Sequence, residues 1–331
     1  MRILVTGALG YIGSHFCFKA LDQGHELLLL DNATTDLSKV ILDAIVTHAK
    51  QPQRAQFFHL DIRNKQGLEA FFKANTGIDA VVHFAALKNA AGSLDAPFLY
   101  YENNVTGSLN LLDALHQAGI TRVVFSSTAA VYSPDAQQPC RESSEINPAT
   151  PYGQSKYMTE VMLSDCVRAH ADLNAVALRY FNVAGADSSG ALTAVLLADK
   201  DKSLLSAILK VARGQAKYLS VYGNDYETRD GTAIRDYIHV LDLVDAHLKA
   251  LDFMDQTSGF HVFNLGYGEG YTVLEMVKAF EAMNDVKIPM QEEGRRSGDL
   301  MAVYADAEQA LSQLGWKPTR DLKRIVGDVW C

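Results

Sequence analysis

The segment PYGQSK places Tyr152 and Lys156 four positions apart, behind a proline at position 151 that favours the start of a helix. On a helix, side chains at this spacing are neighbours, so an ammonium would lie one turn beyond a phenol. A free tyrosine has a pKa of about 10 and is a poor base at neutral pH. A nearby positive charge lowers that pKa, so the pair could take up and return a hydroxyl proton. Taken alone, however, such a pair is usually two neighbours on a solvated helix face.

Apolar, β-rich segments alternate with helical stretches through the first half of the chain. They are almost continuously apolar, which is typical of strands covered on both faces in a parallel sheet. The pattern predicts an α/β fold, a Rossmann-type doubly wound parallel sheet that binds its ligand at the carboxyl ends of the strands. The predicted strands cover residues 2–7, 26–31, 56–61, 80–85, 122–127 and 175–182.

The alternation ends after residue 182, where a segment rich in Gly, Ala, Ser and Asp begins. We therefore expect a nucleotide-binding domain over residues 1–182 and a smaller C-terminal α/β lobe over residues 183–331. Residues around 236–264 could return to the first domain, with a strand at 262–266 joining the main sheet.

The first predicted strand runs into a glycine triplet, Gly7, Gly10 and Gly13, and then into an apolar helix. Glycines at such a turn let the backbone approach a pyrophosphate, whose charge is met by the amides of the helix N-terminus. Asp31 ends the second strand, where it could accept hydrogen bonds from an adenosine ribose. An acidic group there would repel a 2′-phosphate, so the sequence predicts NAD binding and favours NAD over NADP.

Composition narrows the class of protein. The 331 residues carry a net charge of −9, which argues against a nucleic-acid or anionic-membrane partner. The start MRILVTG resembles a strand and not a signal peptide, and we expect a cytoplasmic protein. The four cysteines form no CxxC pair, and the histidines form no HxxxH or HExxH motif, so we expect neither a disulfide framework nor a metal site.

The GxxGxxG spacing and the YxxxK pair resemble the extended short-chain dehydrogenases/reductases. The resemblance implies a catalytic Tyr152 and Lys156, with Thr128 donating or relaying a hydrogen bond to the reacting oxygen. In related nucleotide-sugar dehydratases an Asp-Glu pair follows that hydroxyl residue, whereas this chain has Ala129 and Ala130. Oxidation and reduction without elimination of water are therefore expected.

Further segments resemble the UDP-galactose 4-epimerase (UDP-glucose 4-epimerase) family along essentially the whole chain: FAALKNAAGS, YYENNVTGSLNLL, RYFNVAGA, VYGNDYETRDGTAIRDYIHVLDL and RRSGD. The resemblance implies reversible oxidation of the sugar at C4 by tightly bound NAD, through a 4-keto sugar that rotates before it is reduced on the opposite face. It also implies a homodimer formed through helices of the nucleotide-binding half.

The resemblance assigns two sets of binding residues. The expected cofactor contacts are Gly7, Gly10, Tyr11, Ile12, Gly13, Asp31, Asn32, Asp61, Ile62, Phe84, Ala85, Ala86, Lys88, Asn103, Ser126, Tyr152, Lys156 and Tyr180. The expected substrate contacts are Lys88, Thr128, Tyr152, Phe181, Asn182, Ser203, Leu204, Ser220, Tyr222, Arg235, Arg296, Asp299 and Val303.

Two positions depart from the family pattern. Ser203 stands where many of these epimerases have an asparagine, and Val303 stands where a bulky tyrosine would restrict the pocket to plain hexoses. We therefore hypothesise that the UDP-GlcNAc/UDP-GalNAc pair is also accepted. Three alternatives stay open: an epimerase of another UDP-sugar such as a pentose or uronic acid, an NAD-dependent nucleotide-sugar oxidoreductase, and a non-catalytic nucleotide-binding regulator.

Overall fold

The predicted sheet is confirmed: it has seven strands in the order β10-β6-β5-β4-β1-β2-β3, with parallel pairing between β1 and β2, β2 and β3, β1 and β4, and β4 and β5. The order reverses direction between β1 and β4, and such a switch point opens a ligand crevice at the strand ends. The strands are β1 (Arg2–Thr6), β2 (Glu26–Asp31), β3 (Ala55–His59), β4 (Ala80–His83), β5 (Arg122–Thr128), β6 (Asn174–Tyr180) and β10 (Phe260–Leu265).

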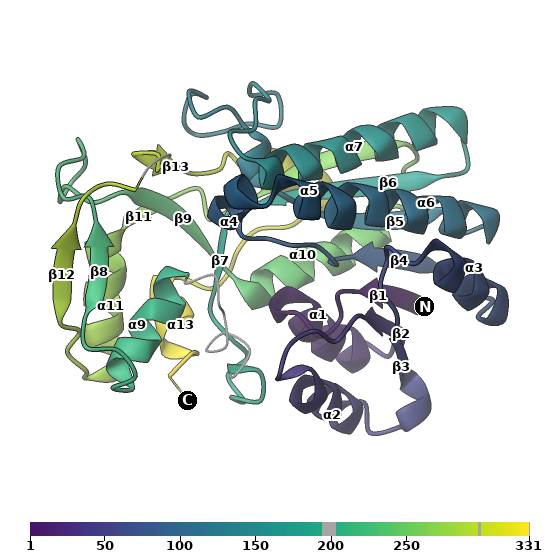
Figure 1. Cartoon of the computed structure of the whole chain (residues 1–331), viewed down its shortest axis with the longest axis horizontal. Coiled ribbons are helices and arrows are strands. Elements are labelled where there is room, and N and C mark those ends of the chain that lie inside the picture. The colour runs from purple at the N-terminus through teal and green to yellow at the C-terminus, as the bar shows by residue number, and fades with distance from the viewer. Residues whose placement is uncertain (194–202, 297–298, 331) are drawn as a thin grey trace. The chain divides into compact units, whose positions relative to one another are not determined.

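Helices cover this sheet on both faces in the computed structural model, which describes residues 1–193, 203–296 and 299–330 (Figure 1). Leucines of β1 and β2 such as Leu4, Leu28 and Leu30 are fully buried between the layers, as their continuous apolar pattern predicts. The helices near this sheet are α1 (Tyr11–Asp22), α2 (Ser38–His48), η1 (Pro52–Arg54), α3 (Lys65–Ala74), α4 (Ala90–Asp95), α5 (Pro97–Tyr100), η2 (Tyr101–Thr106), α6 (Gly107–Gln117), η3 (Ala129–Val131), α7 (Pro151–Ala169) and α10 (Val240–Phe253).

The chain divides into two units, the first made of Met1–Ser133, Glu145–Arg179 and Val244–Phe263. The second unit is made of Pro134–Ser144, Tyr180–Leu243 and Asn264–Cys331. It contains a sheet in which β9 pairs with β7, β11 and β13, and a separate β8–β12 pair. Its elements are β7 (Asn182–Ala184), α9 (Leu204–Ala212), β8 (Leu219–Tyr222), β9 (Ile234–His239), β11 (Gly270–Thr272), α11 (Val273–Asn284), β12 (Met290–Glu293), β13 (Ala302–Val303), α12 (Glu308–Leu314) and α13 (Leu322–Gly327).

The predicted strands match β1 to β6 with small shifts at their ends. The strand expected at 175–182 stops at Tyr180, because the chain turns at Phe181 and then forms β7, which pairs with β9 in the second unit. Asp61 lies just beyond β3 and not within it. The return of 262–266 to the main sheet is confirmed by β10. Which ligand binds residues 1–182 and which binds 183–331 remains a prediction. Within the described part of the chain, every helix is too short or too polar to cross a membrane.

Candidate active site and dinucleotide cleft

The glycine triplet forms a tight turn between β1 and α1. Gly7 has a positive φ of 68°, and a Cβ there would lie 2.6 Å from the backbone nitrogen of Ala85. A Cβ on Gly13 would lie 2.2 Å from the carbonyl oxygen of Gly7. Side chains at these two positions would fill the space in front of the N-terminus of α1. The turn therefore provides the close backbone approach that a dinucleotide pyrophosphate requires.

A cleft opens beside this turn, at the point where the strand order reverses. Ten of the residues predicted to contact the cofactor line it: Gly7, Gly10, Asp31, Asn32, Asp61, Ile62, Phe84, Ala85, Ala86 and Asn103. Sequence reasoning missed the other lining residues, which are Leu9, Leu30, Thr34, Thr35, Ser38, Leu60 and Leu87. Leu9, Leu30, Leu60 and Leu87 are sequence neighbours of predicted contacts, and Thr34, Thr35 and Ser38 lie farther along the chain, between β2 and the start of α2. Only the path of the chain shows that they face the cleft.

The carboxylates of Asp31 and Asp61 line this cleft, and their pKa values are shifted in opposite directions. Asp31 accepts hydrogen bonds from the backbone N–H groups of Leu9, at 3.0 Å, and Ala33, at 2.8 Å. Burial nevertheless raises the pKa of Asp31 above its ordinary value. In contrast, the Arg63 guanidinium holds the pKa of Asp61 well below its usual range. The residues present fit an NAD molecule: a glycine turn for the pyrophosphate and carboxylates for the hydroxyl and amino groups of the adenosine.

The pair Tyr152 and Lys156 lies in the first two turns of α7, and the predicted helix start is confirmed. Thr150 caps the helix by accepting a hydrogen bond from the N–H of Gly153, and Pro151 occupies the first turn. A Cβ on Gly153 would lie 2.2 Å from the carbonyl oxygen of Ala130. The glycine between the two predicted catalytic residues therefore lets α7 pack directly against the segment that follows β5.

Thr128 is the last residue of β5, directly before the segment against which α7 packs. Its side chain is 8% exposed, and its hydroxyl accepts a 3.2 Å hydrogen bond from the N–H of Ala130. Tyr152 is also 8% exposed, and its N–H donates to the hydroxyl of Ser93 at 3.1 Å. Both predicted groups are thus nearly buried and held at the ends of regular elements, which is a suitable arrangement for proton transfer in a water-poor site.

Lys156 is 3% exposed, and its Nζ donates a 2.7 Å hydrogen bond to the carbonyl oxygen of Ser126. The ammonium also lies 4.8 Å from the centroid of the Phe125 ring. Burial lowers the pKa of Lys156 to about 7, although the negative charge of Glu160 opposes this shift. The charge of Lys156 therefore depends on its immediate neighbours.

Glu160 follows Lys156 by one turn of α7 and forms a buried ion pair that sequence reasoning missed. Its carboxylate accepts hydrogen bonds from Arg179 at 2.9 and 2.6 Å and from the hydroxyl of Ser127. Arg179 also donates to the phenol oxygen of Tyr132 at 3.1 Å. The four-residue spacing from Lys156 could have indicated that Glu160 lies next to the lysine on the helix. Its partner Arg179 is too far away in sequence to be predicted in this way.

The substrate residues predicted from the C-terminal motifs lie in the second unit. Arg235, on β9, donates to the carbonyl oxygen of Leu300 at 2.8 Å and lies 3.4 Å from the carboxylate of Asp299. Val303 on β13 is the direct strand partner of Arg235, so the two side chains leave the sheet on the same face. The structure thus brings together three predicted substrate residues that are up to 68 positions apart in sequence.

A second predicted group forms beside β8. The guanidinium of Arg296 lies 3.6 Å from the centroid of the Tyr222 ring. Hydrogen bonding to Arg296, and more weakly to Ser220, lowers the pKa of Tyr222. Such an aromatic face and cation could hold a planar base and a phosphate.

The other predicted residues are placed as follows. Tyr11, Ile12 and Gly13 begin α1, Lys88 lies between β4 and α4, Tyr180 ends β6, Phe181 follows it, Asn182 begins β7, and Leu204 begins α9. Ser203 caps α9 by accepting a hydrogen bond from the N–H of Ser206 at 3.3 Å. Residues 194–202, before Ser203, and Ser297 and Gly298 of the RRSGD motif lie outside the described residues.

Comparison with known proteins agrees with these features. The family model "NAD dependent epimerase/dehydratase family" matches residues 3–266. The UDP-glucose 4-epimerase of Erwinia amylovora is 43% identical over 335 residues, covering 100% of this chain and 97% of that protein. The enzyme of the same name from Bacillus subtilis is 39% identical, covering 100% and 96%.

Solved structures show the same similarity. The UDP-glucose-4-epimerase of Stenotrophomonas maltophila, with bound NAD and formylated UDP-arabinopyranose, superposes with a TM-score of 0.92 at 38% identity, over 100% of this chain and 97% of that one. The enzyme of Bifidobacterium longum, in complex with NAD⁺ and UDP, superposes with a TM-score of 0.90 at 35% identity, over 99% and 97%. The glycine turn, the tyrosine–lysine pair and these full-length similarities show that the chain belongs to the NAD-dependent epimerase/dehydratase family.

Proposed function

We propose that this chain interconverts UDP-galactose and UDP-glucose by reversible oxidation of the sugar at C4, with NAD held tightly throughout. The observation that carries the proposal is its 43% identity to a UDP-glucose 4-epimerase over the full length of the chain. The Tyr152 and Lys156 pair, without an acid and base at Ala129 and Ala130, supports oxidation and reduction over elimination. This reading is favoured over an epimerase of another UDP-sugar or a net oxidoreductase.

Bound NAD supplies the site that accepts a hydride and gives it back. In our proposal Tyr152 removes the proton of the sugar 4-hydroxyl as the C4 hydride leaves, which gives a 4-keto sugar. Thr128 hydrogen-bonds the reacting oxygen, and the buried ammonium of Lys156 favours the phenolate of Tyr152. When the hydride returns to the opposite face of C4, Tyr152 returns its proton, so atoms and electrons balance over each turnover.

The second unit supplies the anchors for UDP in this proposal. Arg235 and Arg296 would bind the diphosphate, Tyr222 the uracil, and Asp299 the ribose hydroxyls. Most of the binding energy would then come from the UDP part. The sugar must turn over between the two hydride transfers, and tight contacts to it would prevent that rotation.

We also propose that the protein is a cytoplasmic homodimer. Several large apolar side chains are exposed on helices α4 to α7, which contact one another. Phe98 is 88% exposed, an unusual state for an aromatic residue in a monomer. The exposed residues are Leu94, Phe98, Leu99, Leu109, Met158 and Val161.

Val303 supports a wider substrate range. Its side chain shares a sheet face with Arg235, the proposed diphosphate ligand, and it is far smaller than a tyrosine. We propose that an N-acetyl group is accepted there, so that UDP-GalNAc and UDP-GlcNAc are interconverted as well. The UDP-Glc/GlcNAc 4-epimerase of Campylobacter jejuni is 36% identical to this chain.

One assay tests the proposal directly. The purified protein is incubated with UDP-galactose without added NAD, and UDP-glucose and NADH are both measured. The proposal expects UDP-glucose to form up to equilibrium with no net NADH. Stoichiometric release of NADH, or turnover only of a UDP-pentose or UDP-uronic acid, would favour the runner-up functions instead.

A further inference from the structure

The side chains that line the cleft beside the glycine turn carry a net negative charge. The lining includes the two carboxylates of Asp31 and Asp61, and among the residues that the structure describes no lysine or arginine lines it. A dinucleotide adds the negative charges of its pyrophosphate to the same space. Like charges at short range repel, so a cation close to these carboxylates should favour retention of such a ligand.

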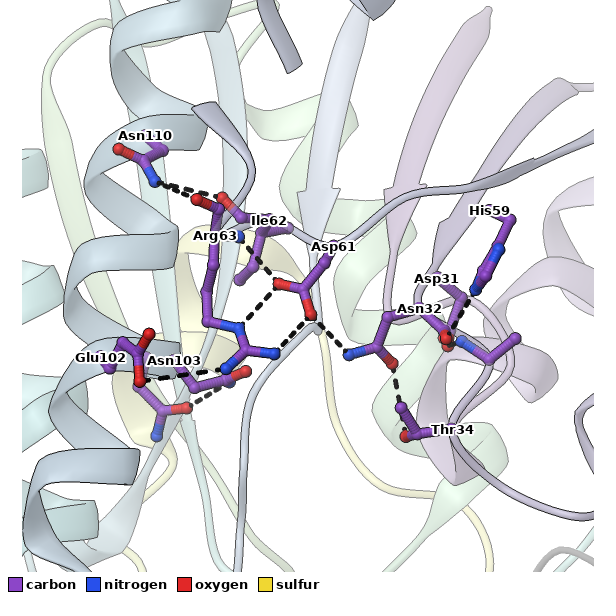
Figure 2. Close-up of polar contacts among 12 residues, drawn as sticks. Asp31, Asn32, Thr34, His59, Asp61, Ile62, Arg63, Glu102, Asn103 and Asn110 are labelled. Carbon is purple, nitrogen blue, oxygen red and sulfur yellow. Dashed lines mark hydrogen bonds and ion pairs between the residues drawn. The ribbon is translucent and has the colours of Figure 1, made fainter. Parts of the chain in front are cut away.

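Arg63 lies directly behind one of these carboxylates. Its Nε donates to Oδ1 of Asp61 at 3.0 Å, and its Nη2 donates to Oδ2 at 2.8 Å (Figure 2). The guanidinium therefore binds the carboxylate in a bidentate manner, through two parallel hydrogen bonds. Asn32 donates to the same Oδ2 at 3.1 Å from the other side. These bonds fix the plane of the Asp61 carboxylate, and the bidentate geometry is one that a lysine cannot reproduce.

The segment that carries Arg63 is itself anchored to the helix η2–α6. The side-chain amide of Asn110 donates to the carbonyl oxygens of Ile62 and Arg63 at 3.4 and 3.1 Å. Arg63 also reaches the carboxylate of Glu102, at 4.0 Å (Figure 2). The Arg63 side chain is 37% exposed and that of Asp61 is 24% exposed, so removal of Arg63 leaves a carboxylate that solvent still reaches.

We propose that Arg63 is a positioning residue for the cofactor, which acts through Asp61: it orients that carboxylate towards the adenosine end of NAD and offsets the negative charge of the cleft. The inference rests on the proposed binding of NAD in this cleft. It gives Arg63 a role in retention, because an enzyme that regenerates NAD within each turnover works only while the cofactor stays bound. Arg63 itself does not line the cleft, so it would act without contacting the cofactor.

The test measures NAD release from the purified holoprotein by exchange against labelled NAD, in the absence of sugar. Arg63→Ala is expected to release NAD about tenfold faster, which corresponds to the loss of a hydrogen bond to a charged group. Arg63→Lys should release NAD at a rate between those of wild type and Arg63→Ala. Lys65→Ala is the matched control, because Lys65 ties the same segment to α6 through Asp113 at 2.7 Å without touching Asp61. It should release NAD at the wild-type rate.

A double-mutant cycle separates action through Asp61 from a general structural effect. In an Asp61→Asn background, Arg63→Ala should change the release rate less than twofold, since the shared interaction is already lost. Unchanged release from Arg63→Ala, equal effects of Lys65→Ala and Arg63→Ala, or effects that multiply in the double variant would overturn the inference, as would a wild-type protein that binds no NAD. A protein that holds NAD but does not epimerise would overturn only the proposed function.

Discussion

The ammonium of Lys156 donates a 2.7 Å hydrogen bond to the carbonyl oxygen of Ser126, so the lysine of α7 is fixed to strand β5. This contact binds the two elements that carry the predicted catalytic groups, Tyr152 on the helix and Thr128 on the strand. It also keeps a positive charge in a buried position, where its effect on a neighbouring phenol is larger than in water.

The pKa of Lys156 predicts a pH-dependent stability. The folded value is about 7 because of burial, whereas an unfolded lysine titrates near a pKa of about 10.4. Between these values the unfolded chain binds more protons, so the free energy of unfolding should rise with pH from about 7 to about 10. Lys156→Met should flatten this rise, as measured by urea unfolding of the NAD-free protein across that range. The exposed Lys73→Met is the control, and an equal slope in wild type and Lys156→Met would refute the prediction.

The buried pair of Arg179 and Glu160 predicts a strong stability effect. Arg179→Met leaves the Glu160 carboxylate buried without its cation and should lower the free energy of unfolding by about 3–5 kcal/mol. The double variant Glu160→Gln/Arg179→Met removes both charges and should recover most of that loss. Denaturant titrations measure both. If the double variant were as unstable as Arg179→Met, packing and not charge would explain the loss.

The exposed apolar residues on α4 to α7 predict a dimer that a single charge disrupts. Phe98→Glu should convert the protein to a monomer in light scattering after gel filtration, because a carboxylate buried in an apolar interface is costly. Leu311→Glu is the matched control, since Leu311 is also exposed and apolar but lies on α12. A wild-type protein that elutes as a monomer at micromolar concentration would contradict the proposed homodimer.

Val303 predicts the substrate range. Val303→Tyr should reduce kcat/KM for UDP-GalNAc at least tenfold and leave kcat/KM for UDP-galactose within about threefold, since a bulky ring excludes only the larger sugar. Parallel kinetics with the two sugars on wild type and variant measure this. Absence of turnover of UDP-GalNAc by the wild type would rule out the wider range.

Local patterns were enough to predict the parts of the molecule that lie close together in sequence. The first six strands, the glycine turn and the start of α7 at Pro151 all follow from periodicity and turn chemistry within short segments. The predicted end of β6 was wrong by two residues. Asn182 does lie in a strand, but only its pairing with Tyr237 of β9 decides which sheet that strand joins.

The interactions that tune the site could not be predicted, since they join residues far apart in the chain. Arg179 meets Glu160 only after β6 pairs beside β5, and Arg235 meets Asp299 only after the second unit has folded. Arg63 is different, because it follows Asp61 by only two residues. An acidic and a basic residue at that spacing in a turn are a local signal for an ion pair. The cofactor contacts implied by the family resemblance did not include Arg63.

The most direct test of the proposed mechanism is the turnover of UDP-galactose by Tyr152→Phe, with bound NAD and folding checked in the same preparation. The phenyl ring keeps the packing of Tyr152 but has no proton to exchange, so kcat should fall by about 10²–10⁴-fold while NAD stays bound. A Tyr152→Phe enzyme that retains NAD and turns over at near the wild-type rate would contradict the account.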